Sequence, residues 1–90
     1  MNDLRVGRWR LGDEQRAAHA LMRRVPPTAP VSANERLVPH LATRREVYIF
    51  PAGVGRSEWV LTLEGEVRRE PAVGYREVAR AGPWVLLRRG

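Results

Sequence analysis

The sequence predicts a small α/β domain with a mixed sheet of about five strands, early strands parallel, a C-terminal β-hairpin, and one or two helices packed on the sheet. Three observations predict this class. The chain has 90 residues, which suits a single hydrophobic core. A clear helical pattern is followed by alternating strand-like and helix-like segments. Two further strand-like runs, residues 75–81 and 84–89, then meet at Gly82 and Pro83, a connection typical of a hairpin.

The first helix is expected to begin at Asp13, with residues 1–12 as an N-terminal tail or first strand and residues 13–90 as the single α/β domain. Asp13 is a candidate N-cap, and its charge suits the positive end of the helix dipole. Pro26 and Pro27 stop the helix, because backbone before a proline disfavours the helical region. Apolar residues recur here at the spacing of one helix face: Ala18, Leu21, Met22 and Val25.

A second, shorter helix is predicted within residues 35–43, with Asn34 or Ser32 as a possible cap. Its boundary depends on Pro39. A helix that begins at Asn34 would lose a backbone hydrogen bond at this proline. A start near Val38 would place Pro39 in the first turn and avoid the loss. Both starts remain open at this point.

The remaining segments supply the strands of the sheet. Residues 30–34 form a short first strand, and residues 46–51 contain four consecutive apolar side chains, which predicts a central strand covered on both faces. On this interpretation the side chain of Ile49 belongs to the core. Residues 57–63 are rich in aromatic and branched side chains and form another strand. The charged residues 64–72 are predicted to be a loop.

The charge pattern predicts a weakly anion-binding surface. All 16 basic residues are arginine and the formal net charge is +6, so anionic partners are physically plausible. The arginines are spread from Arg5 to Arg89 without long runs. We therefore expect weak, non-specific polyanion binding that disappears near physiological salt. Arg44 and Arg45 are the candidate anion contacts.

Few residues have the chemistry of a catalytic or metal site. The chain has no cysteine, and His19 and His40 lack the spacing of a metal motif. No catalytic residue, metal or cofactor is predicted. Ser32, Asn34 and His40 form a candidate polar cluster near the end of a predicted strand, where open α/β sheets place ligand sites. A structural role is favoured for it, with His40 partly buried and hydrogen-bonded to Ser32, Asn34 or nearby backbone.

The sequence also predicts that the chain is soluble as given. No segment approaches the roughly 20 apolar residues that a membrane-spanning helix needs. The longest uncharged segments, residues 25–34 and 47–55, are short and interrupted by proline. The first twelve residues carry three arginines and no apolar core, so they do not form a secretory signal.

Several short motifs resemble a known family. Leu37-Val38-Pro39-His40-Leu41 and Tyr48-Ile49-Phe50-Pro51 occur together with Ser32-Ala33-Asn34 and Arg45. This combination resembles the C-terminal soluble region of an uncharacterised family of bacterial multi-pass membrane proteins, domain of unknown function 2079. The membrane portion of that family is similar to lipid-sugar-dependent glycosyltransferases of the type-C fold. The resemblance extends from about Asp13 to Arg89.

The resemblance implies a non-catalytic accessory or interaction domain. Such a domain would pack against a membrane glycosyltransferase-like partner, or against such a portion of its own parent chain, and help position an acceptor or a neighbouring subunit. Two departures affect this inference, and one of them is that the membrane helices of the family are missing from this sequence. The family has an aspartate-containing strand where this chain has residues 57–63, which contain no aspartate. The alternative function is a small arginine-rich anion-binding module that acts on nucleic acid or on acidic lipid headgroups. The oligomeric state is left undetermined.

Overall fold

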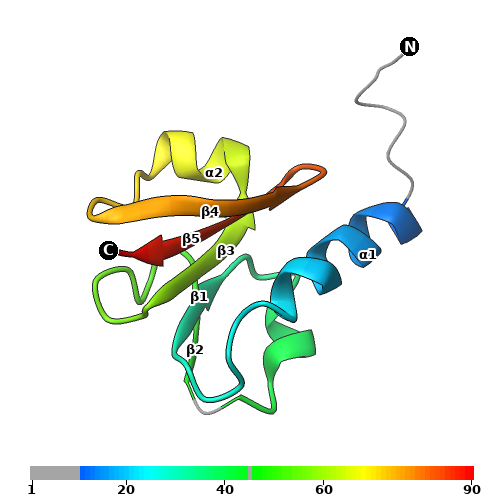
Figure 1. Cartoon of the computed structure of the whole chain (residues 1–90), viewed down its shortest axis with the longest axis horizontal. Helices are drawn as coiled ribbons and strands as arrows, with labels where there is room; N and C mark the ends of the chain where they lie inside the picture. The colour runs from blue at the N-terminus through cyan, green and yellow to red at the C-terminus, as the bar shows by residue number, and fades with distance from the viewer. Residues whose placement is uncertain (1–10, 45) are drawn as a thin grey trace.

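The computed structural model, which describes residues 11–44 and 46–90, confirms the predicted fold class (Figure 1). Five strands form one mixed sheet in the order β2-β1-β3-β5-β4. The early strands are parallel, since β1 pairs with both β2 and β3 in parallel, and β5 pairs in antiparallel fashion with β3 and β4. The elements in chain order are α1 (Leu11–Met22), β1 (Val31–Ala33), the 3-10 helix η2 (Val38–Leu41), β2 (Val47–Ile49), β3 (Trp59–Leu63), α2 (Glu64–Arg69), β4 (Tyr75–Ala81) and β5 (Trp84–Arg89).

The C-terminal hairpin has the predicted bounds and turn. β4 and β5 pair from Tyr75 opposite Arg89 to Ala81 opposite Trp84. Gly82 takes a positive φ of 57° in the connection, a backbone conformation that glycine adopts without steric cost. A register shift between Glu77 and Ala79 interrupts the pairing. A bulge of this kind helps to protect an edge strand such as β4 from pairing with another chain.

Helix α1 begins earlier and ends earlier than predicted. It starts at Leu11 and ends at Met22, so Asp13 lies in the first turn of the helix and is not its N-cap. Residues 11 and 12 belong to the helix, and the tail or strand predicted for residues 1–10 lies outside the described residues. Beyond Met22 the chain continues in turns, which keep Val25 in the core at 2% exposure.

The second helix confirms one of the two open starts. It is a 3-10 helix that begins at Val38, with Pro39 in its first turn. Leu37 is the N-cap residue and makes no side-chain capping bond, so the predicted cap at Asn34 or Ser32 is wrong. The Asn34 side chain instead accepts a hydrogen bond from the backbone N–H of Arg36 at 2.8 Å. This local bond turns the chain between β1 and η2.

Two predictions about the remaining segments are wrong. Strand β2 lies at the edge of the sheet and not in its centre, and the side chain of Ile49 is 52% exposed. Residues 64–69 form helix α2 and not a loop. The Glu64 and Arg68 side chains, four residues apart, form a 2.8 Å ion pair along this helix, a spacing that supports helical backbone.

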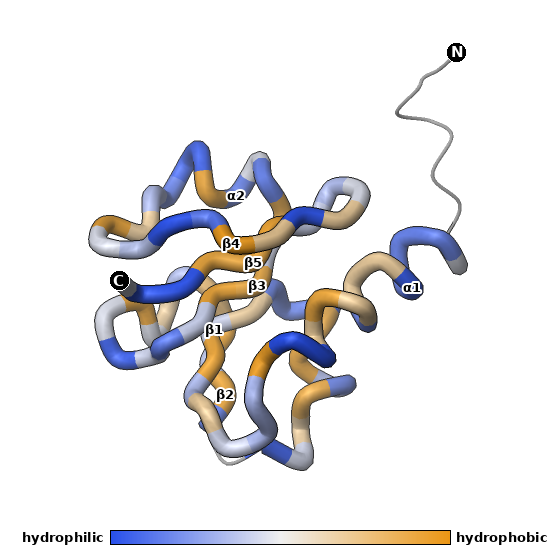
Figure 2. Tube along the Cα trace, viewed as in Figure 1, coloured by the Kyte–Doolittle hydropathy of each residue, from blue (hydrophilic) through white to orange (hydrophobic). Residues whose placement is uncertain are grey.

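The core has two layers, one on each face of the sheet. Alternate residues of a strand point to opposite faces, so Leu61 contributes to one layer and Val60 to the other. The larger layer lies under α1, and the smaller one lies under the α2 side around Phe50 and Leu87. Figure 2 shows the apolar strands β1, β3 and β5 running through the middle of the molecule. The larger layer contains Ala18, Leu21, Met22, Val25, Val31, Leu37, Leu41, Trp59, Leu61, Trp84 and Leu86.

Candidate functional site

A small polar cluster lies at the carboxyl ends of the parallel strands β1 and β3. Asn34 follows β1 and Thr62 lies in β3, and their side chains are 4% and 0% exposed. Both donate hydrogen bonds to Oε1 of Glu66 in α2, Asn34 at 2.8 Å. Buried polar groups need such partners, because an unpaired one costs about 1–3 kcal/mol. The cluster therefore ties α2 to the two central parallel strands.

The hydrogen bonds of this cluster favour an ionised carboxylate at Glu66. Burial raises the pKa of the Glu66 carboxyl, but bonds from Thr62, Asn34 and the backbone of Leu63, together with the charge of Arg69, outweigh burial and leave that pKa below its ordinary value. Hydrogen bonds to the charged form of an acid act in this direction. A carboxylate held in this state accepts hydrogen bonds and does not suit general acid catalysis near neutral pH.

Because the pKa of Glu66 is lowered in the fold, we expect acid to destabilise the protein through this residue. Its contribution to stability is fully present above the unfolded-state value, about 4.3, and is lost as the pH falls through the lower folded value. In urea titrations from pH 5 to pH 3, the unfolding midpoint of Glu66→Gln should fall less than that of the wild type. Glu35→Gln, at an exposed residue just after Asn34, is the control and should follow the wild type. Parallel curves for all three proteins would contradict this account.

The structure separates the three residues of the predicted polar cluster. Ser32 is fully buried in β1, and its hydroxyl donates to the carbonyl oxygen of Ala52 at 2.7 Å. Asn34 bonds to Glu66 as described. His40 lies on η2 and is exposed, so the prediction of a partly buried imidazole bonded to Ser32 or Asn34 is wrong. The side chains of β1 are buried in the two core layers. Helix η2 contacts the core through Leu41, which is 2% exposed, and leaves His40 on the surface.

His40 instead borders a cleft between α1, η2 and the start of β5. Its ring meets the ring of His19 from α1 edge to face, with centroids 4.9 Å apart. The guanidinium of Arg36 lies 5.9 Å from the centroid of the Trp84 ring, within the range of a cation–π contact. The cleft has a volume of about 70 Å³ and is lined by Glu14, Gln15, Ala18, His19, Arg36, Leu37, His40 and Trp84.

Of the two candidate anion contacts, Arg44 and Arg45, the structure describes only Arg44. The Arg44 guanidinium donates to the carbonyl oxygens of Val25 at 3.1 Å, Pro26 at 2.8 Å and Met22 at 3.2 Å. The Met22 carbonyl belongs to the last residue of α1, where helices have acceptors without intrahelical partners, and the other two carbonyls lie in the turns that follow the helix. Arg44 therefore holds the end of α1 and the turns after it from a distant segment of the chain. Arg45 lies outside the described residues, and anion binding by the pair stays a prediction.

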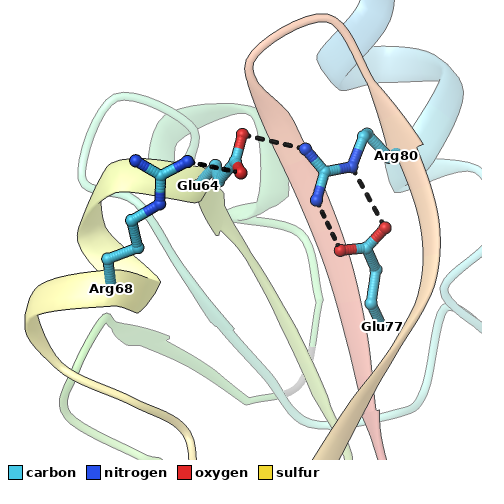
Figure 3. A network of polar contacts seen from close by, with 4 residues as sticks. All are labelled: Glu64, Arg68, Glu77 and Arg80. Atoms are coloured by element: carbon cyan, nitrogen blue, oxygen red, sulfur yellow. Dashed lines mark hydrogen bonds and ion pairs between the residues drawn. The ribbon is translucent and has the colours of Figure 1, made fainter.

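A second polar network lies on the surface between α2 and β4 (Figure 3). Arg80 binds Glu64 at 2.8 Å and Glu77 at 2.7 Å, and Glu64 also binds Arg68 at 2.8 Å. The hydrogen bonds from Arg68 and Arg80 lower the pKa of the Glu64 carboxyl, and those from Arg80 lower that of Glu77. The network pairs both Arg68 and Arg80 with acidic side chains.

Sequence reasoning missed two members of the buried cluster. Thr62 was assigned to a strand without a role, and Glu66 was assigned to a charged loop. The signal that could have found Glu66 is the spacing of Glu64 and Arg68, which is that of a helical ion pair. Gly65 weakens this signal, because glycine between Glu64 and Arg68 is unfavourable within a helix. Among the described residues, no group of three or more metal-ligating side chains is positioned to hold a metal ion.

Comparison with known proteins identifies one family. The model of a family described as "Predicted membrane protein (DUF2079)" matches residues 4–70, which is most of the chain. The hairpin β4–β5 lies beyond the match. No curated protein and no solved structure matches the chain. In residues 11–44 and 46–90, neither α-helix is long and apolar enough to cross a membrane.

Proposed function

Because this chain belongs to the family of predicted membrane proteins DUF2079, we propose that it is a non-catalytic accessory domain. The domain docks on a glycosyltransferase-like, membrane-embedded portion of a protein of this family. In this position it helps to place an acceptor or a neighbouring subunit. The observation that carries the proposal is the family match over residues 4–70.

The cleft at α1 and η2 is the proposed docking surface. All of its lining residues except Trp84 lie inside the matched range. It combines an aromatic ring, a guanidinium and two imidazoles, a mixture that resembles the anchor residues of protein interfaces, where tryptophan and arginine are enriched. The cleft is small, so it would receive one or two side chains of the partner and not a whole helix.

A non-catalytic role is supported by how the buried polar side chains are used. The Ser32 hydroxyl is bonded to the Ala52 carbonyl oxygen, and Asn34 is bonded to Glu66. Both bonds hold segments of the fold together, so neither side chain is free to act on a substrate. Catalysis would need a nucleophile that lies next to a base and is also within reach of a substrate. The Thr62 hydroxyl donates to the Glu66 carboxylate, but Thr62 is fully buried.

Binding to the membrane-spanning part of a family protein, purified in detergent, tests the proposal. We expect saturable binding that is weakened about tenfold or more by the double variant Arg36→Ala/His40→Ala, as for truncation of anchor residues. His40 is exposed, so His40→Ala alone should change the free energy of unfolding by less than about 1 kcal/mol. The matched control Arg24→Ala/Thr28→Ala alters exposed residues outside the cleft. Equal loss of binding in the two double variants would contradict docking at the cleft.

A further inference from the structure

Four arginines gather at one end of the sheet, which we name the arginine-rich end: Arg56, Arg76, Arg88 and Arg89. Arg76 and Arg88 are directly opposite each other in the β4–β5 pairing. Arg89 donates to the carbonyl oxygen of Gly55 at 2.8 Å, which brings the loop that carries Arg56 to the same end. All four side chains are exposed. In Figure 1 this end lies at the left, opposite α1.

Most of this positive charge is not neutralised by carboxylates. Arg88 pairs with Glu58 at 2.8 Å. Arg56, Arg76 and Arg89 form no ion pair with a carboxylate among the described residues. Elsewhere, Arg16, Arg68 and Arg80 are paired with acidic side chains, whereas the ion pairs among the described residues do not include the exposed Arg23, Arg24, Arg36 and Arg69. What distinguishes the arginine-rich end is that three arginines without an acidic partner lie close together there.

An exposed apolar tip adjoins these arginines. Val73, in the α2–β4 connection, is 85% exposed, so its apolar side chain faces the solvent. The backbone N–H of Gly90 donates to the carbonyl oxygen of Gly74 at 3.1 Å, so the tip lies beside the end of β5. Figure 2 shows the apolar part of this connection next to the hydrophilic end of the chain.

From this combination we propose that the arginine-rich end binds an anionic lipid surface. Arginines near such a surface attract acidic headgroups, and a protruding valine can enter the interfacial region and bury apolar area. Membership of a membrane-protein family places such a surface within reach of the domain. The proposal does not depend on docking at the cleft, which lies at the α1 side of the molecule (Figure 1).

In residues 11–44 and 46–90, every phenylalanine, tryptophan and tyrosine side chain is at least partly buried, so none offers a fully open platform for single-stranded nucleic acid. Base stacking needs an accessible ring. The ring of Trp59 is 7% exposed and lies under the guanidinium of Arg88, 5.0 Å from its centroid. Tyr75 is partly buried against the smaller core layer, and its hydroxyl donates to the Ser57 carbonyl oxygen and accepts from the Gly55 N–H. These features favour a lipid surface over RNA.

Vesicle sedimentation tests the proposal with the whole chain. The vesicles contain either phosphatidylcholine alone or phosphatidylcholine with 30% phosphatidylglycerol, a probe composition of our choosing (about one anionic lipid in three). We expect binding to the anionic vesicles only, decreasing as salt is added. Arg56→Gln/Arg76→Gln should weaken it about 30-fold, given the usual contribution of two arginines. Arg23→Gln/Arg24→Gln removes the same charge from exposed residues at the α1 side and should change binding less than about threefold.

Val73→Ser distinguishes a lipid surface from a general polyanion site. Its side chain makes little contact with the fold, so the variant should keep the wild-type melting temperature. We expect it to bind anionic vesicles several-fold more weakly and to bind polyuridylic acid as the wild type does. The proposal is overturned if Arg23→Gln/Arg24→Gln weakens vesicle binding as much as Arg56→Gln/Arg76→Gln. It is also overturned if Val73→Ser has no effect on vesicles, or if polyuridylic acid binds more tightly than the vesicles do.

Discussion

Trp84→Ala should destabilise the protein by about 3–5 kcal/mol, as expected for removal of a buried tryptophan. Trp84 begins β5 and is 3% exposed. Its indole N–H donates to the carbonyl oxygen of Glu14 at 3.1 Å, so this one side chain joins the last strand to the first helix. The loss is a large part of the stability of a domain of this size.

Guanidinium chloride titration followed by circular dichroism measures this effect. Trp84→Phe is the control, because it keeps most of the apolar ring area and removes the indole N–H bond to Glu14. We expect a smaller loss for it, about 1–2 kcal/mol. If Trp84→Ala lost less than about 1.5 kcal/mol, below the usual range for such a change, α1 would not be held on the sheet by this residue.

Leu86→Ala should cost about 2–5 kcal/mol, while Ile49→Ala should cost less than about 1 kcal/mol. Leu86 is fully buried in β5, between β3 and β4. Ile49 is 52% exposed on the edge strand β2. If residues 47–50 formed a central strand, as the apolar run predicts, Ile49→Ala would cost as much as Leu86→Ala. The same denaturant titration on the two variants therefore distinguishes a central β2 from the observed edge strand. Equal losses would contradict the exposed position of Ile49 on β2.

The sequence was most informative where local signals decide the structure. The hairpin was predicted with its bounds, because Gly82 and Pro83 mark the turn between two strand-like runs. The parallel early strands follow from the alternation of helix-like and strand-like segments. The order of the strands could not be predicted. An apolar run such as residues 47–50 can occur in a central strand, but here it forms an edge strand followed by the buried Phe50.

The candidate site was less predictable, because it depends on contacts between distant segments. Asn34 was recognised as a polar residue at a strand end, but its partner Glu66 lies 32 residues away. The meeting of His19 with His40, and of Arg36 with Trp84, likewise depends on how α1, η2 and β5 pack. Arg44 was taken for a surface charge. Its hydrogen bonds to the end of α1 become visible only in three dimensions.

Site-specific crosslinking tests most directly whether the domain docks on a membrane-embedded partner through the cleft. The chain has no cysteine, so His40→Cys and Glu70→Cys each carry a photoreactive label at one exposed position, the first at the cleft and the second away from it. The account predicts that, with the membrane-spanning part of a family protein in detergent, the label at position 40 crosslinks to that protein and the label at position 70 does not. Crosslinking from neither position, or from both to the same extent, would contradict it.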